Sequence, residues 1–194
     1  MRIISGKARG TKINTIDEVT TRPTLDRVRE SLFNIIQNYV SNTYVLDIFA
    51  GSGALGIEAL SRGAKQAVFC DINKDAVKII NENLMKTRLK ENAIVYNMNY
   101  KKIIEKLSKN DFKFDIVFVD PPYKENLAVN SVKLIIQNNL LNENGIIIIE
   151  TDEKERDLKE LQELNKIDNE NLLKIKIIDE RKYGRANLIF LRVI

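Results

Sequence analysis

The chain of 194 residues contains no histidine, one cysteine and three prolines. The absence of imidazole excludes Ser-His-Asp triads and zinc sites of the usual Cys/His kind. Because Cys70 is the only thiol, no intrachain disulfide can form, and we expect a small buried thiol at the end of a strand. We therefore expect any catalysis to proceed without histidine and without a metal.

Long apolar runs are also absent. The longest aliphatic run, residues 146–149, is far below the roughly 20 residues that cross a bilayer, and no apolar segment of signal-peptide length follows Met1. The apolar fraction of 44% and the charged fraction of 30% are typical of a globular protein. We expect a cytoplasmic monomer that does not associate with a membrane.

The positive charge is concentrated at the N-terminus. Residues 1–29 hold seven Lys or Arg and three Asp or Glu, so the excess of four equals the net charge of +4 of the whole chain. A basic segment on a neutral remainder is the expected footprint of contact with nucleic-acid phosphates, although a solvated charged surface would give the same pattern.

The pattern of apolar residues predicts an α/β fold. A short hairpin is expected from residues 2–5 and 11–14, followed by a helix over residues 25–39 that begins at the N-cap residue Thr24. Strands are predicted at residues 44–49, 67–71, 93–96, 114–119 and 145–150, and helices at residues 54–62, 74–86, 101–107, 126–138 and 153–164. Two final strands, residues 172–180 and 186–193, should close this mostly parallel, seven-stranded sheet in antiparallel fashion, with helices on both faces.

A glycine loop follows the first predicted strand of the sheet. Gly51, Gly53 and Gly56 match the GxGxxG fingerprint, and Asp71 lies 20 residues after Gly51, where it could accept hydrogen bonds from ribose hydroxyls. The fingerprint alone fits NAD or S-adenosylmethionine. Asp47 favours the second ligand, because a carboxylate repels a pyrophosphate but attracts an ammonium and a sulfonium.

A second motif, Asp120-Pro121-Pro122-Tyr123, follows the strand predicted at residues 114–119. Ligands of open α/β sheets bind outside the carboxyl ends of strands, and the two prolines prevent the strand from continuing. The Asp120 carboxylate and the Pro121 carbonyl could accept hydrogen bonds from a planar group that carries an NH₂, and Tyr123 could stack on it. The motif therefore indicates methyl transfer to the exocyclic amine of a nucleobase.

Several segments together resemble the bacterial RsmD-like methyltransferases. The similar segments are residues 2–10, residues 22–34, residues 47–60 with their glycine loop, and the motif at residues 120–123. They occur in the family's order and cover nearly the whole chain. The resemblance implies a Rossmann-like class I methyltransferase fold with a small N-terminal hairpin and helix, and a single domain over residues 1–194. Within it, residues 1–40 would form the basic N-terminal part and residues 41–194 the catalytic core.

The family resemblance also implies the reaction and its residues. Members methylate the exocyclic N2 of one guanine in 16S ribosomal RNA of the small subunit, with S-adenosylmethionine as donor and S-adenosylhomocysteine as product. The implied donor-binding residues are Asp47, Phe49, Ala50, Gly51, Gly53, Asp71 and Asn99. The implied catalytic residues are Asp120, Pro121, Pro122 and Tyr123. Relatives often carry Asp where this chain has Asn99, which weakens that one assignment.

Arg9, Arg22, Arg27 and Arg29 are candidate contacts for RNA phosphates. Arg22 could instead clamp the loop after its helix to the catalytic face, and Arg22, Arg27 and Arg29 could equally be surface arginines on an amphipathic helix. Three alternatives to ribosomal RNA methylation stay open: a DNA amino-methyltransferase, an RNA-binding protein without catalysis, and an NAD-dependent dehydrogenase.

Overall fold

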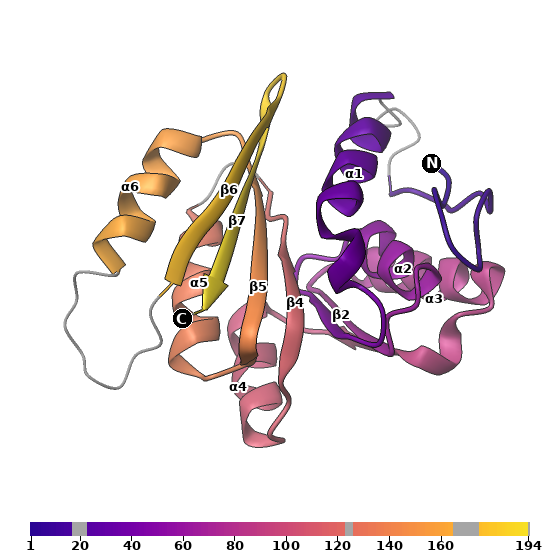
Figure 1. The fold of residues 1–194 in the computed structure, drawn as a ribbon. Helices are drawn as coiled ribbons and strands as arrows, with labels where there is room; N and C mark the ends of the chain where they lie inside the picture. The colour runs from indigo at the N-terminus through magenta and orange to yellow at the C-terminus, as the bar shows by residue number, and fades with distance from the viewer. Residues whose placement is uncertain (17–22, 123–125, 165–174, 194) are drawn as a thin grey trace. The chain divides into compact units, whose positions relative to one another are not determined.

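A computed structural model describes residues 1–16, 23–122, 126–164 and 175–193 (Figure 1). The chain forms two compact units, Met1–Tyr100 and Lys101–Ile194. The predicted single domain over residues 1–194 stays a prediction.

The first unit contains three parallel strands in the order β3-β2-β1. Its elements are α1 (Pro23–Ile36), η2 (Gln37–Tyr39), β1 (Tyr44–Asp47), α2 (Ala54–Ser61), β2 (Gln66–Asp71), α3 (Lys74–Thr87), η3 (Lys90–Asn92) and β3 (Ala93–Asn97). Helix α2 packs against β1 and β2, and α3 packs against β2 and β3. Pro23 suits the first turn of α1 because its missing N–H would have no partner within the helix.

The parallel register brings polar residues to one edge of this sheet. Asp47 is aligned with Phe69 of β2, and Asp71 is aligned with Asn97 of β3. Buried apolar residues from both sides of the strands form the core, including Phe33, Leu46, Phe69 and Ile80. This packing fixes the carboxyl ends of β1 and β2, from which the glycine loop and Asp71 extend.

The second unit contains four strands in the order β4-β5-β7-β6. Its elements are α4 (Tyr100–Lys109, whose first residue belongs to the first unit), β4 (Phe114–Val119), α5 (Leu127–Gln137), β5 (Leu141–Thr151), α6 (Lys154–Leu164), β6 (Ile175–Tyr183) and β7 (Ala186–Val193). Strands β4 and β5 are parallel, and the hairpin of β6 and β7 adds to β5 in antiparallel fashion (Figure 1). The predicted antiparallel closure is therefore confirmed.

Most predicted elements are confirmed within a few residues, and β4 has the predicted bounds. The largest difference is in β5, which begins four residues before the predicted strand. The register between β4 and β5 shifts over this segment, and Asn144 has a left-handed φ of 63°. Its polar residues Asn142, Glu143 and Asn144 resemble a turn in the sequence although they continue the strand.

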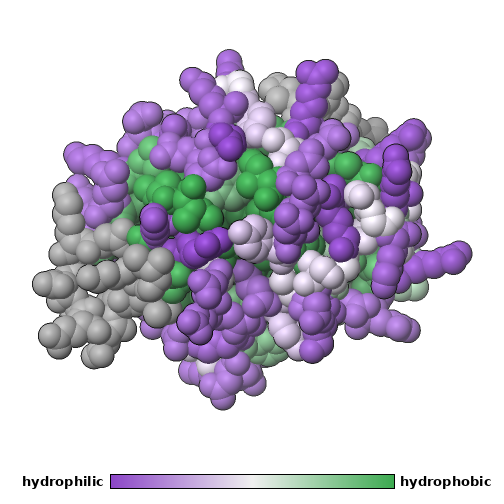
Figure 2. Space-filling model, viewed as in Figure 1, coloured by the Kyte–Doolittle hydropathy of each residue, from purple (hydrophilic) through white to green (hydrophobic). Residues whose placement is uncertain are grey.

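The predicted N-terminal hairpin is reduced to a single antiparallel bridge between Arg2 and Lys12. We call residues 1–14 the N-terminal arm. On the face shown in Figure 2, hydrophilic residues cover most of the surface, and some apolar residues are visible between them. Within the described residues, no helix is both long enough and apolar enough to cross a membrane.

Candidate functional site

The glycine loop joins β1 to α2 and has the backbone geometry that its sequence predicts. Gly51 and Gly53 have φ values of 54° and 79°, in the left-handed region that favours glycine. Gly53 is the N-cap residue of α2. A Cβ atom built on Gly51 would meet nothing within 4 Å, so there is open space beside the backbone at this point. A ligand can approach the loop closely here.

Asp47 lies at the end of β1 and is only 1% exposed. Its Oδ2 accepts a hydrogen bond from the N–H of Gly56 at 3.0 Å, which ties the end of the strand to the first turn of α2. Burial is the largest influence on this carboxyl, and it raises the pKa of Asp47 from 3.8 to about 7; the nearby Asp71 adds to the increase. A cation that enters the site would stabilise the charged form.

Asp71 lies at the end of β2 and is partly exposed. Its Oδ2 accepts from the N–H of Gly51 at 2.8 Å, and its Oδ1 accepts from the N–H of Asn73 at 2.8 Å. The structure therefore brings Asp47, Asp71 and the glycine loop together, as the sequence predicts for a donor site. Carboxylates and amides in this arrangement suit a ligand with hydroxyl and amino groups.

Asn83 is a residue of this site that the sequence analysis missed. It lies on α3 with 0% exposure, and its Nδ2 donates to the carbonyl of Ser52 in the glycine loop at 2.9 Å. The same Nδ2 donates to the carbonyl of Asn14 at 3.0 Å, and Oδ1 accepts from the N–H of Asn14 at 2.7 Å. A polar residue at a core position of an amphipathic helix was the available signal, since buried amides need partners.

Two further donor-site candidates, Phe49 and Asn99, lie beside Tyr100, the first residue of α4. The ring of Phe49 is 5.5 Å from that of Tyr100, with an interplanar angle of 44°. Asn99 lies directly before Tyr100 and is partly exposed. The preceding residue, Met98, is tied to β2, because its N–H donates to Asp71 O at 3.0 Å and its carbonyl accepts from the Cys70 thiol at 3.2 Å. These bonds fix the backbone position directly before Asn99 near Asp71.

Cys70 is the small buried thiol that the sequence predicts at the end of a strand. Burial, with a contribution from Asp71, raises its pKa to about 12, so the thiol stays protonated at neutral pH. Within the described ranges, no group of three or more Cys, Asp or Glu side chains is arranged to hold a metal ion.

The motif that begins at Asp120 follows β4 in the second unit. Asp120 is partly exposed, Pro121 is buried and Pro122 is exposed. Tyr123 lies outside the described residues. Asp120 and the glycine loop belong to different units, and the roles of residues 120–123 stay predictions.

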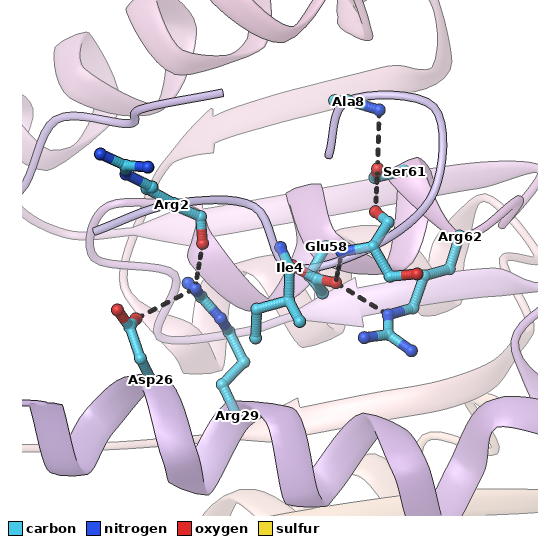
Figure 3. Close-up of polar contacts among 9 residues, drawn as sticks. Arg2, Ile4, Ala8, Asp26, Arg29, Glu58, Ser61 and Arg62 are labelled. Carbon is cyan, nitrogen blue, oxygen red and sulfur yellow. Dashed lines mark hydrogen bonds and ion pairs between the residues drawn. The ribbon is translucent and has the colours of Figure 1, made fainter. Parts of the chain in front are cut away.

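The four candidate RNA-binding arginines differ in their environments. Arg9 and Arg27 are exposed, and Arg22 lies outside the described residues. Arg29 is only 4% exposed; its Nη2 donates to the carbonyl of Arg2 and to Asp26 Oδ1, the latter at 3.1 Å (Figure 3). Burial lowers the pKa of Arg29. Its position indicates a role in holding the N-terminal arm against α1.

A second anchor of the N-terminal arm is Glu58 on α2, which is fully buried. Its carboxylate accepts from the N–H groups of Ile4 at 2.8 Å and Ser5 at 3.0 Å, and from Arg62 Nε at 2.8 Å (Figure 3). Ser61 adds to this anchor, because its Oγ accepts from the N–H of Ala8 at 2.9 Å. The arm is therefore packed onto the helix that begins at the glycine loop.

Comparison with known proteins gives a family for the whole chain. The family model described as "Conserved hypothetical protein 95" matches residues 1–192. "Ribosomal RNA small subunit methyltransferase D" of Haemophilus influenzae is 41% identical over 159 residues, which cover 81% of each chain. "Putative rRNA methyltransferase YlbH" of Bacillus subtilis is 40% identical over 152 residues, which cover 78% of this chain and 83% of the relative.

The solved structure of "Putative methyltransferase yhhF" from Escherichia coli aligns with a TM-score of 0.78 at 30% identity, over 100% of this chain and 97% of its own. This likeness confirms the fold class predicted from the sequence, a Rossmann-like class I methyltransferase fold with a mostly parallel sheet. The chain belongs to the family described as Conserved hypothetical protein 95 and is an RsmD-like methyltransferase.

Proposed function

We propose that this protein transfers a methyl group from S-adenosylmethionine to the exocyclic N2 of one guanine in the 16S ribosomal RNA of the small subunit. The observation that carries the proposal is the glycine loop: Asp71 accepts from the N–H of Gly51, Asp47 accepts from the N–H of Gly56, and open space lies beside Gly51. The chain that carries this loop is similar to small-subunit ribosomal RNA methyltransferases. The proposal treats residues 1–194 as one catalytic domain that acts as a monomer in the cytoplasm, without a metal.

The donor would be held by the residues of the first unit. Asp71 would accept from its ribose hydroxyls, Asp47 would attract its ammonium group, and Asn99 would contact its adenine. The backbone from Phe49 to Gly53 would line the open space beside the loop. The bound donor supplies an electrophilic methyl group on a sulfonium.

The acceptor amine would be held by the second unit. An exocyclic amine is a poor nucleophile because its lone pair is delocalised into the ring. Hydrogen bonds from its N–H groups to the Asp120 carboxylate and the Pro121 carbonyl would orient the nitrogen and stabilise the positive charge that develops on it. Pro122 would stop the strand at this point, and Tyr123 would stack on the extruded base. Holding both reactants in line provides much of the remaining acceleration.

We assign the RNA contacts to exposed basic residues. Arg9 and Arg27 would neutralise phosphates, and Arg22 is proposed for the same role. Because Arg29 is buried and paired with Asp26, we assign it to positioning the N-terminal arm that carries Arg9.

The test is methyl transfer from labelled S-adenosylmethionine to small ribosomal subunits from a strain in which the gene is deleted. Naked 16S ribosomal RNA and duplex DNA serve as comparison substrates, and the labelled base is then identified by mass spectrometry. We expect N2-methylguanine at one position. Activity on DNA alone, or methylation of another base, would overturn the proposal.

The role of Asp120 is tested with a matched pair of variants in and after β4. Asp120→Asn removes the carboxylate proposed to face the amine, and we expect the rate of methyl transfer to fall at least about 100-fold. Asp115→Asn removes a charge from the other end of β4 and keeps an oxygen that accepts from Asn142, so we expect little change. Equal activity of both variants would refute the assignment of Asp120.

A further inference from the structure

The contacts of Asn83 join two segments that are far apart in the sequence. Asn14 ends the N-terminal arm and Ser52 lies in the glycine loop, yet the buried side chain of Asn83 on α3 bonds to both. All three residues lie in the first unit, so the arrangement does not depend on the position of the second unit. Because the same Nδ2 donates to both carbonyls, a shift of the arm that moves this side chain also changes its hydrogen bond to Ser52 in the glycine loop.

The rest of the N-terminal arm has little freedom to move independently. Gly6 has a φ of +83°, and a Cβ atom at this position would lie 1.8 Å from the carbonyl oxygen of Ser61. The N–H of Lys7 donates to the same carbonyl at 2.8 Å. The arm is thus attached to the C-terminal end of α2, whereas Asn83 attaches it to the loop before α2. The arm is therefore bonded directly to the C-terminal end of this eight-residue helix and is linked through Asn83 to the glycine loop that precedes it.

We propose that Asn83 is a positioning residue that couples the N-terminal arm to the glycine loop, so that RNA bound by the arm and donor bound by the loop strengthen each other's binding. The part that concerns RNA and donor rests on the proposed function. Coupling of this kind is reciprocal: if RNA increases the affinity for the donor, the donor increases the affinity for RNA by the same factor.

The first test needs neither RNA nor donor. Asn14→Pro removes the N–H that donates to Asn83 Oδ1, whereas Asn14→Ala keeps both backbone bonds and removes only the side-chain contacts with Glu82 and Lys86. We expect the peptide that contains residues 51–53 to exchange amide hydrogen about tenfold faster in Asn14→Pro and at the wild-type rate in Asn14→Ala. Unchanged exchange in Asn14→Pro would overturn the proposal.

The second test measures the coupling itself. The dissociation constant of S-adenosylhomocysteine is measured with and without saturating unmethylated small ribosomal subunits. We expect the subunits to tighten binding about fivefold or more in the wild type and less than about twofold in Asn83→Ala. The matched control is Asn81→Ala on the same helix, because Asn81 bonds to Val77 and Lys90 rather than to the arm or loop. It should retain the wild-type ratio.

The outcomes separate this proposal from the proposed function. A purely structural Asn83 would lower the melting temperature of Asn83→Ala and leave the ratio of dissociation constants unchanged, which would overturn the coupling. A ratio of one in the wild type would also overturn it. Failure of the wild type to methylate ribosomal RNA would refute the proposed function, and the exchange experiment would still decide whether the arm controls the loop. If Asn83→Ala does not fold, Asn83→Asp replaces it, because it keeps the oxygen that accepts from Asn14 and loses both donated bonds.

Discussion

The raised pKa of Asp47 predicts an unusual dependence of stability on pH. In the unfolded chain the carboxyl has its ordinary pKa of 3.8, and in the folded protein burial raises the pKa to about 7. Between these values the folded state binds more protons than the unfolded state. The contribution of Asp47 to stability is therefore fully present below about pH 4 and is lost as the pH rises through about 7.

The size of this loss follows from the two pKa values. A difference of one pH unit corresponds to about 1.4 kcal/mol, so the free energy of unfolding should fall by about 2 to 3 kcal/mol between pH 5 and pH 8 through Asp47 alone. Asp47→Asn removes the titration, and its amide oxygen can still accept from the N–H of Gly56. Groups that do not interact with Asp47 titrate alike in the two proteins, so they cancel in the difference between them.

The assay is urea unfolding of wild type and Asp47→Asn at pH 5, 6, 7 and 8 without ligand. We expect the stability difference to move in favour of the variant by about 2 to 3 kcal/mol over this range, whatever its value at pH 5. Over the same range, the affinity of the wild type for S-adenosylhomocysteine should rise, because the proposed contact of the ligand's ammonium with Asp47 needs the ionised carboxylate. A stability difference that stays constant from pH 5 to pH 8 would refute the reasoning.

Two further predictions concern the N-terminal arm. Gly6→Ala should destabilise the protein in urea unfolding by about 2 kcal/mol more than Gly10→Ala, because both glycines have a φ near +80° but only a Cβ at residue 6 meets the Ser61 carbonyl. Equal losses of stability in the two variants would show that the backbone moves to avoid the contact between the new Cβ and the Ser61 carbonyl. Arg9→Ala and Arg27→Ala should each reduce the slope of log affinity for 16S ribosomal RNA against log salt concentration by about 1, because each removes one phosphate contact. Unchanged slopes in gel-shift titrations would exclude both residues from the RNA interface.

Local patterns predicted the elements that local sequence determines. The apolar run of β4 and the prolines after it predict that strand and its end, and helix α3 follows from its periodicity. In the structure the side chain of Asn73 caps this helix and accepts from the N–H of Asp75 at 2.8 Å. The glycine loop was predictable for the same reason, since its fingerprint places glycines where the backbone requires positive φ. Such signals lie within a few residues of the structure that they specify.

The missed features depend on contacts between distant segments. Arg29 belongs to an amphipathic helix and its sequence context suggests a surface cation, but its guanidinium binds the backbone of Arg2, 27 residues away. Asn83 and Asn14 are 69 residues apart, and only the packing of α3 beside the arm brings them together. The helical pattern of a single sequence can indicate that Asn83 is buried, but it contains no signal for the partner of Asn83 or of Arg29. The arm was therefore predicted as a basic segment that contacts phosphates, and its buried anchors, Arg29 and Glu58, were missed.

The single thiol of the chain has a practical consequence. Cys70 is fully buried in the middle strand of the β3-β2-β1 sheet, and its carbonyl accepts from the N–H of Ala50 at the start of the glycine loop, at 2.9 Å. A thiol-specific dye can react only when this strand is uncovered, and no other cysteine contributes background. The natural protein therefore carries its own reporter for opening of the first unit, whose labelling rate can be followed as ligands are added.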